Sequence, residues 1–252
     1  MKIVRYQING DAVKYGWMLD DKIGEIQGDI FGEYRRREAK TPIAEVKLAA
    51  PCLPTKILCV GRNYVDHARE LGNEVPKVPL IFLKPSSSII SNGENIILPP
   101  QSNQVEHEAE LVVVIGKRGR NITPETAKEY IFGYTIGNDI TARDLQKADG
   151  QWTRAKGFDT FCPFGPWIDT EFDASDAVVT CRVNGQMRQM ASTRDMVFNV
   201  STLIAYISSV MTLEPGDIIF TGTPAGVSEL KNGDIVDVEI EGLGKLSNPV
   251  KV

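Results

Sequence analysis

The chain has 252 residues, which is enough for one sizeable hydrophobic core. With 42% hydrophobic and 24% charged residues, it has the composition of an ordinary soluble globular protein. The formal net charge of -5, without any basic block, excludes nucleic acid as an expected partner. The opening MKIVRYQING lacks the apolar stretch of a signal peptide, and no apolar run is long enough to span a bilayer. We therefore expect a cytoplasmic protein with no membrane partner.

The first part of the chain, residues 1 to about 48, alternates short apolar runs with turn residues, as in KIVRYQI, NGD and AVKYGWML. This alternation predicts a small antiparallel meander. The two prolines of LAAPCLPTKILCVG then mark a plausible boundary. We predict a small N-terminal β domain over residues 1–50 and a larger second domain over residues 51–252.

Short strands dominate the rest of the chain. A helix is predicted over 63–71, ending at Gly72, because glycine commonly terminates helices. TPETAKEYI predicts a second helix with Thr123 as its cap and Pro124 at its first position. A third, over 200–210, has one apolar face. The absence of a strand–GxGxxG–helix unit excludes a dinucleotide-binding fold. The expected class is α+β and mainly β, with strands at 57–60, 80–83, 95–98, 110–116, 132–138, 178–183, 217–221 and 234–240.

Cysteine and histidine are scarce, which restricts the redox and metal chemistry. No two cysteines form a CxxC pair, so we expect reduced, mostly buried thiols at Cys52, Cys59, Cys162 and Cys181. Only two histidines are present, which argues against a zinc site.

The stretch VEHEAELVVVIG, residues 105–116, places acidic side chains at the start of an apolar strand. Side chains two apart on a strand share a face, so Glu108 and Glu110 hold two carboxylates side by side. Glu106 extends the same row. Such carboxylates repel one another unless a cation lies between them. The alternative is an edge strand whose outward charges prevent aggregation.

A third carboxylate, Asp139, follows an apolar strand in GYTIGNDITARDLQ. Glu108, Glu110 and Asp139, here called the acidic triad, would suit Mg²⁺ or Mn²⁺. Three protein oxygens leave coordination positions for water or substrate, as a catalytic site needs. The alternative role for Asp139 is a helix cap before Thr141.

In GRNYVDHAREL, His67 and Glu70 are three residues apart and would share one face of a helix. A histidine oriented by a carboxylate is a competent general base near neutral pH. The alternative is a solvated surface helix with charged pairs.

Three further positions place a polar side chain in a loop or at a strand end. The loop QWTRAKGFDTFCPFGP, residues 151–166, is rich in aromatic and cationic residues. Its Lys156 could bind an anion or polarise a carbonyl, or it could be a surface lysine. Lys84 in IFLKPSSSI and Thr223 in GDIIFTGTPAGV follow buried strands, as residues do where strands open onto a site. The second of these segments is also simply a good turn.

Together, these segments resemble the fumarylacetoacetate hydrolase superfamily over about residues 55–252. The N-terminal fifty residues look like the small domain that many bacterial and archaeal members carry before the catalytic one. The resemblance rests on seven strings in the family's order: GRNYVDHARE, FLKPSSS, EHEAELVVVIGKRGR, GYTIGNDITARDLQ, AKGFDTFCPFGP, PGDIIFTGTPAGV and GDIVDVEIEGLGKLSN.

The resemblance implies a mixed β-roll catalytic domain, usually dimeric, so a homodimer is expected. In that family a Glu-x-Glu pair and an aspartate bind Mg²⁺ or Mn²⁺, and the acidic triad matches them, whereas Glu106 falls outside the pair. His67 and Glu70 match a pair on a lid helix that activates water, and Lys156 matches an active-site lysine. Positions that hold the substrate are matched by Lys84, Arg143, Gln146 and Thr223.

The resemblance predicts a metal-dependent enzyme that acts on enolisable 2-oxo (di)carboxylic acids. The first hypothesis is C–C bond cleavage of an acylpyruvate- or fumarylacetoacetate-type 2,4-dioxo acid, or decarboxylation of oxaloacetate. The alternative is isomerisation or tautomerisation of 2-hydroxyhepta-2,4-diene-1,7-dioate or oxaloacetate. Two features favour this alternative. The added N-terminal domain is more typical of members named as isomerases of 2-hydroxyhepta-2,4-diene-1,7-dioate, and similar QW…FDTFCPxGP stretches occur in members proposed to be oxaloacetate tautomerases. A third hypothesis, a metal-containing binding protein without catalysis, conflicts with the presence of every matched position.

Overall fold

Twenty strands carry most of the fold in the computed structural model, which describes residues 1–252. The mainly-β α+β class expected from the sequence is confirmed. The first strands are β1 (Lys2–Gln7), β2 (Lys14–Leu19), β3 (Lys22–Gly28), β4 (Tyr34–Arg36), β5 (Thr41–Pro42) and β6 (Lys47–Ala49). The others are β7 (Ile57–Gly61), β8 (Leu80–Lys84), β9 (Ile89–Ile90), β10 (Ile96–Ile97), β11 (Val105–Glu106), β12 (Ala109–Ile115), β13 (Ile131–Asn138), β14 (Thr141–Ala142), β15 (Cys162–Asp169), β16 (Val178–Val183), β17 (Gln186–Ser192), β18 (Ile218–Phe220), β19 (Ile235–Ile240) and β20 (Gly244–Lys251).

The helices are few and short. None is long and apolar enough to cross a membrane. The α-helices are α1 (Val65–Glu70), α2 (Arg143–Asp149), α3 (Thr153–Lys156) and α4 (Val200–Val210). Single 3-10 turns occur at η1 (Ile43–Glu45), η2 (Ser86–Ser88), η3 (Ala127–Tyr130) and η4 (Thr193–Asp195).

Two of the three expected helices form. α4 spans the predicted residues, and the side chain of Asn199 caps it by accepting the N–H of Thr202 at 2.9 Å. α1 is shorter than predicted and begins at Val65. The expectation of a helix capped by Thr123 was wrong, because that segment makes only η3 before the chain enters β13 at Ile131.

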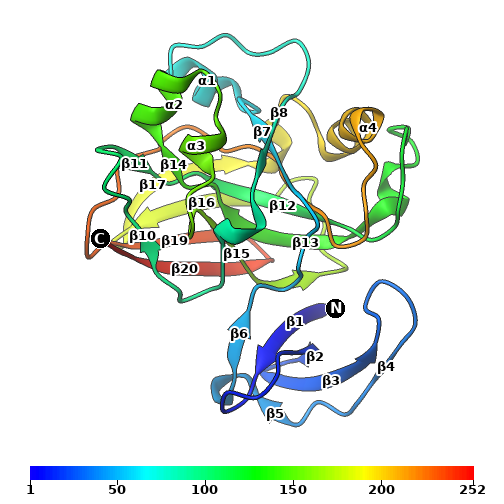
Figure 1. Ribbon diagram of the computed structural model, residues 1–252. Coiled ribbons are helices and arrows are strands. Elements are labelled where there is room, and N and C mark those ends of the chain that lie inside the picture. The colour runs from blue at the N-terminus through cyan, green and yellow to red at the C-terminus, as the bar shows by residue number, and fades with distance from the viewer.

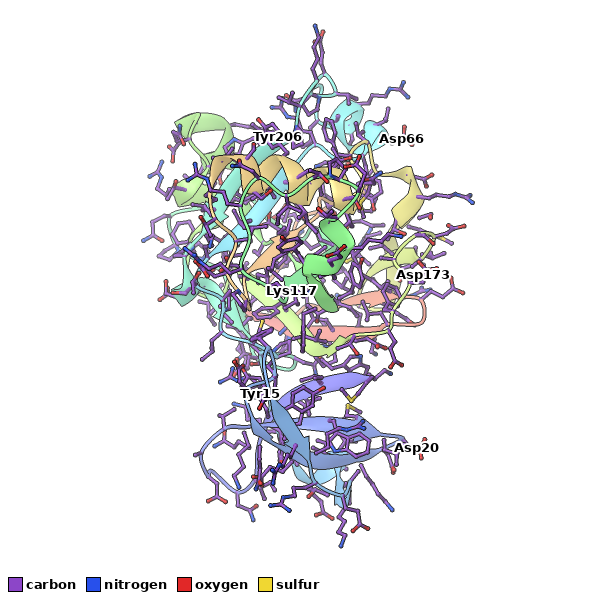
Figure 2. All side chains as sticks on the ribbon, turned by 90° about the vertical axis from the view of Figure 1, so that its right-hand side faces the viewer. Tyr15, Asp20, Asp66, Lys117, Asp173 and Tyr206 are labelled. Atoms are coloured by element: carbon purple, nitrogen blue, oxygen red, sulfur yellow. The ribbon has the colours of Figure 1, made fainter.

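One large sheet runs through both lobes of the molecule, in the order β4-β3-β2-β1-β15-β13-β12-β18-β7-β8 (Figure 1). The predicted antiparallel meander is confirmed in β1 to β4. β1 then pairs antiparallel with β15, with Lys2 opposite Asp169 and Ile3 opposite Ile168. The N-terminal strands form the lower lobe in Figures 1 and 2, yet their sheet continues that of the main body. α1, marked by Asp66 in Figure 2, lies at the opposite end.

A second sheet, in the order β10-β20-β19-β16-β17, shares the largest apolar cluster, of 22 buried residues, with β12 and β13. A separate apolar cluster joins Val113 and Ile115 of β12 to Leu203, Ile204 and Ile207 of α4. β12 is therefore buried along its whole length and pairs with a strand on each side. A strand in this position is a nearly continuous apolar run, as AELVVVI is.

All four cysteines are free and buried, as expected from the sequence. Burial raises the pKa of the Cys52 and Cys162 thiols to about 12. These thiols stay protonated near neutral pH, so they are poor nucleophiles and poor metal ligands.

Candidate active site

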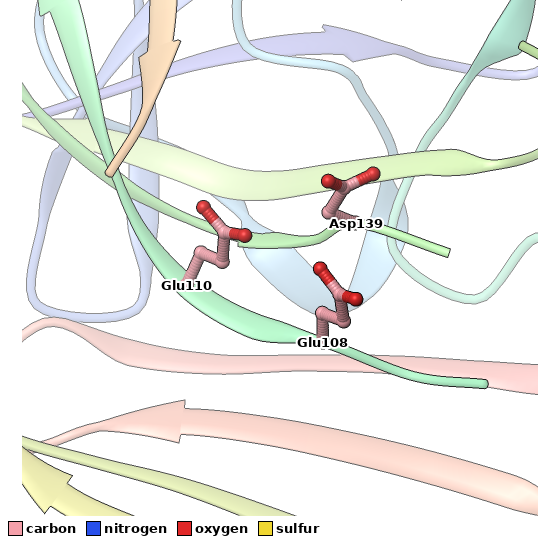
Figure 3. Close-up of side chains that lie close together, drawn as sticks. All are labelled: Glu108, Glu110 and Asp139. Carbon is pink, nitrogen blue, oxygen red and sulfur yellow. The ribbon is translucent and has the colours of Figure 1, made fainter. Parts of the chain in front are cut away.

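The acidic triad lies where β12 and β13 meet. Glu108 immediately precedes β12, Glu110 is its second residue and Asp139 directly follows β13. Antiparallel pairing sets Glu110 opposite Gly137, and the N–H of Asp139 donates to the carbonyl of Glu108 at 2.9 Å. One carboxylate oxygen from each residue lies within 4.8 Å of the others (Figure 3). The strand register therefore gathers the three carboxylates that the sequence singled out.

The pKa values of Glu108 and Glu110 are shifted in opposite directions. Burial raises the pKa of Glu110 well above its ordinary value, and the nearby charges of Asp139 and Glu108 raise it further. Burial also opposes ionisation of Glu108, but Lys156 and Arg143 outweigh it and lower its pKa. This crowding fits a hard divalent cation, because a cation among the oxygens would favour the ionised form of each residue. Three carboxylate donors of this kind suit Mg²⁺ or Mn²⁺.

Glu110 is held in place by the turn that carries Thr223. Its carboxylate accepts one hydrogen bond from the protein, from the N–H of Gly222 at 2.6 Å. Gly222 has a φ of +99°, and a Cβ there would lie 2.6 Å from Cβ of Asn63. Only glycine fits this position. The turn Gly222–Pro224 therefore shapes the loop and also holds the Glu110 carboxylate.

Two buried lysines complete the inner wall. Nζ of Lys156, at the end of α3, lies 2.8 Å from a carboxylate oxygen of Glu108 and 2.7 Å from one of Asp139. Nζ of Lys84 lies 2.5 Å from Asp139 and also donates to the carbonyl of Ile140 at 3.2 Å. Burial disfavours the Lys156 cation, but Asp139 and Glu108 outweigh it and raise its pKa. Both lysines are almost completely buried, so Lys156 is not the surface residue of the alternative interpretation.

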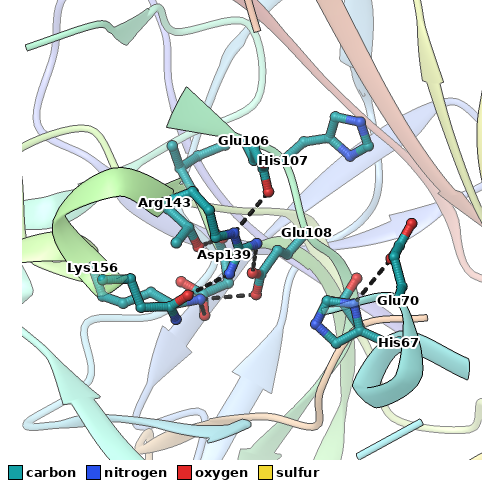
Figure 4. Close-up of polar contacts among 12 residues, drawn as sticks. His67, Glu70, Glu106, His107, Glu108, Asp139, Arg143 and Lys156 are labelled. Carbon is teal, nitrogen blue, oxygen red and sulfur yellow. Dashed lines mark hydrogen bonds and ion pairs between the residues drawn. The ribbon is translucent and has the colours of Figure 1, made fainter. Parts of the chain in front are cut away.

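Arg143, the first residue of α2, is a buried cation that joins three polar side chains (Figure 4). It contacts Glu106 at 2.7 Å, Glu108 at 2.5 Å and Gln146 at 2.6 Å. Glu106 also accepts a hydrogen bond from Gln104 at 2.7 Å. The third glutamate of the acidic row thus pairs with Arg143, a role that sequence reasoning missed although Glu106 lies on the same row.

His67 and Glu70 lie on α1, above the carboxylates. Nδ1 of His67 is 3.5 Å from a Glu70 oxygen, too far and too poorly aligned for a hydrogen bond, so this buried nitrogen has no hydrogen-bond partner. The N–H of Gly226 donates to both Glu70 oxygens, at 3.0 and 3.1 Å. Burial lowers the pKa of His67, and Arg143 lowers it further, against the opposing effects of Glu108 and Glu70. His67 is therefore neutral near pH 7 and able to accept a proton.

A small cavity of about 40 Å³ joins these groups. Its lining brings together six of the predicted site residues: His67, Glu108, Arg143, Gln146, Lys156 and Thr223. The side chains of Glu110, Asp139 and Lys84 lie outside that lining. The hydroxyl of Thr223 donates to the carbonyl of Ala109 at 2.9 Å and accepts from Gln189 at 2.8 Å, so its proton is already used.

A second hydrogen-bond network, which sequence reasoning missed, is centred on His107 and Gln189 and contacts the backbone of β12. The ring of His107 lies 3.0 Å from Oε1 of Gln189 and 2.9 Å from Oγ of Ser228. Gln189 Oε1 also accepts the N–H of Ala109 at 3.0 Å, and its amide nitrogen donates to Thr223. Figure 4 shows His107 directed away from the carboxylates on either side of it. Alternation along the strand was the available signal, since residue 107 must face opposite to 106 and 108.

Comparison with known proteins accounts for this arrangement. Residues 56–251 match the family described as "Fumarylacetoacetate (FAA) hydrolase C-terminal". The chain belongs to the fumarylacetoacetate hydrolase family. Members of this family are enzymes, and this chain is accordingly an enzyme of the superfamily. Residues 1–51 match a second description, "Rv2993c-like, N-terminal".

Relatives of this family member are named after different activities or are called uncharacterized. An uncharacterized protein of Methanocaldococcus jannaschii is 58% identical over 198 residues, covering 79% of this chain and 84% of that protein. The oxaloacetate tautomerase Fahd2a of Rattus norvegicus, described as mitochondrial, is 46% identical over 221 residues, covering 83% of this chain and 71% of that protein. A solved structure named 5-carboxymethyl-2-hydroxymuconate delta-isomerase, from Mycobacterium smegmatis, is 43% identical with a TM-score of 0.92, covering 100% of this chain and 99% of that one.

Proposed function

We propose that the protein catalyses keto–enol tautomerisation of an enolisable 2-oxo dicarboxylic acid such as oxaloacetate, with a divalent cation. The observation that carries this proposal is the shared cavity of His67, Lys156 and Glu108, which is lined by a neutral imidazole with no hydrogen bond at Nδ1 and by a buried cation. The relatives named as oxaloacetate tautomerase and as isomerase favour this reaction over the C–C cleavage that the sequence alone favoured.

The acidic triad would hold Mg²⁺ or Mn²⁺. That ion would stabilise the negative charge that develops on the 2-oxygen when a proton leaves C3. Lys156, already shared by Glu108 and Asp139, would provide a second positive charge beside that oxygen. Lys84 and Arg143 would keep the outer oxygens of the triad neutralised and fixed.

His67 would move the proton. Ketonisation transfers one proton from the 2-oxygen to C3, so one neutral base that accepts it and then returns it to carbon is sufficient. Its lowered pKa keeps the imidazole in the accepting form near pH 7. Glu70, fixed by the N–H of Gly226, would stabilise the imidazolium between the two transfers.

Carbon–carbon cleavage, either hydrolysis of an acylpyruvate-type acid or decarboxylation of oxaloacetate, is the second candidate. The observation in its favour is the exposure of Glu70, whose side chain is 33% accessible beside the buried His67. Water could reach this pair, and a His–Glu pair can activate water for attack on a carbonyl.

The homodimer, the cytoplasmic location and the division at residue 50 stay predictions.

Proton NMR of the Mg²⁺-loaded protein with oxaloacetate and, separately, with acetylpyruvate tests both candidates. The proposal expects faster keto–enol exchange of oxaloacetate, abolished by EDTA, with no pyruvate above the EDTA-treated control. Metal-dependent pyruvate would overturn it in favour of cleavage, and the relative rates from the two acids would then rank decarboxylation against hydrolysis.

A further inference from the structure

We propose that Arg62 binds the distal carboxylate of the substrate and so makes the enzyme selective for dicarboxylic acids. The inference deepens the proposed function, on which it rests, by naming a specificity-determining residue. Arg62 lies directly after β7, and among the arginines and lysines that line the cavity it alone is half-buried rather than buried.

The backbone at Arg62 adopts a conformation that is unusual for its residue type. Its φ is +58°, in the left-handed region that residues other than Gly, Asn and Asp seldom occupy. Such conformations have a free-energy cost and tend to cluster at functional sites. Here the conformation occurs at a half-buried arginine that lines the cavity.

An aromatic wall connects Arg62 to the inner cation. The guanidinium carbon of Arg62 is 6.0 Å from the ring centre of Trp152, which meets Phe82 edge-on at 5.2 Å. Nζ of Lys156 lies 5.0 Å from the centre of the Phe82 ring. The preceding Gly61 makes room for this wall, since a Cβ there would lie 2.7 Å from the Trp152 ring. All five of these residues line the cavity, and the aromatic wall has a cation at each end.

The charges of the site leave Arg62 without a partner. The acidic triad and Glu106 provide four buried carboxylates, and three buried cations pair with them, namely Lys84, Arg143 and Lys156. With a divalent cation bound and all four carboxylates ionised, these groups would carry a single excess positive charge, which the inner carboxylate of a 2-oxo acid neutralises. No carboxylate lies within 4.0 Å of the Arg62 guanidinium. One negative charge at the outer end of the substrate would complete the balance.

Arginine suits this task because its planar guanidinium can donate two parallel hydrogen bonds to one carboxylate. Glu70 on α1 does not line the cavity, and its carboxylate accepts a hydrogen bond from the N–H of Gly226. The outer end of the cavity therefore favours a carboxylate over the neutral acyl tail of an acylpyruvate.

The test measures binding rather than turnover. L-malate and L-lactate both offer a carboxylate and a 2-hydroxyl to the inner site, but only malate has a distal carboxylate. Calorimetric titration of each into the Mg²⁺-loaded protein would compare the wild type with Arg62→Gln and Arg62→Lys. Arg69→Gln is the matched control, because Arg69 is an exposed arginine on α1 that pairs with Asp66 and does not line the cavity.

We expect Arg62→Gln to weaken malate binding about tenfold or more, with lactate binding changed less than about twofold. Arg62→Lys should retain part of the preference and Arg69→Gln all of it. Unchanged lactate binding also shows that the variant is folded. Malate binding to the wild type no tighter than lactate binding, or equal losses for both ligands, overturns the inference while leaving the NMR result intact. An Arg62-dependent malate preference without tautomerisation overturns the proposed function alone.

Discussion

The two histidines of this chain are both buried, yet their surroundings differ. His107, behind the acidic triad, has hydrogen-bond partners at both ring nitrogens, Gln189 and Ser228. His67, on α1, has a buried Nδ1 with no partner and faces the cavity. Burial lowers the pKa of both, that of His107 to about 4. The difference shows that burial keeps either ring neutral, but only the ring with an unused nitrogen remains available for proton transfer.

The two histidines also lie in differently supported segments. His107 lies between two strands and is fixed by side chains from β17 and from the loop after β18. α1 has only six residues, and Gly72 follows it with a φ of +68°. A helix this short is marginal in isolation, so its stability depends on tertiary contacts.

Replacing His67 has the largest expected effect. His67→Asn should lower the tautomerisation rate by about 10² or more, because it removes the proton carrier. Affinity for Mn²⁺, measured by calorimetry, should stay close to that of the wild type, since the acidic triad is untouched. Unchanged turnover in this variant would mean that His67 has no catalytic role.

Replacing His107 should instead affect stability, in a way that depends on pH. The folded-state pKa of about 4 lies below the ordinary value of 6.5, so acid protonates the unfolded chain first. This neutral, buried ring thus favours folding above pH 6.5, and that contribution of about 3 kcal/mol is lost as the pH falls to about 4.

Urea unfolding of the wild type and His107→Gln at pH 7.5 and 4.5 measures this contribution. The destabilisation caused by the substitution should be larger at pH 7.5 than at pH 4.5. A difference that is the same at both pH values would show that His107 is not held neutral by the fold.

The smallest expected effect comes from Glu70, which distinguishes the surroundings of His67 from those of His107. The charge of Glu70 raises the pKa of His67, so Glu70→Gln should lower that pKa further. The acid limb of kcat/KM should therefore move to lower pH, while kcat falls roughly tenfold because the imidazolium loses a stabilising partner. A limb that moves to higher pH would assign the titration to another group.

Local sequence signals predicted much of the strand framework. The apolar run LVVVI could only be a buried strand or a buried helix, and its short length favoured the strand. The α4 segment was predicted because its apolar face is a local feature. α2 and α3 were missed because each is only seven residues or fewer and is stabilised by contacts made through Arg143 and Lys156 rather than by an apolar period. The TPETAKEYI error has a similar cause, since strand pairing overrode a good local capping signal.

The sequence by itself determined which residue types could do chemistry and which strand faces they occupy, because alternation along a strand is local. It therefore predicted the acidic triad and the His67–Glu70 pair. Only the tertiary structure decided that Glu106 pairs with Arg143 and that Arg62 lines the same cavity as Lys156. It also decided that both nitrogens of His107 are used in hydrogen bonds, to Gln189 and Ser228. These outcomes depend on contacts between residues 37 to 121 positions apart in the chain, which no local sequence pattern predicts.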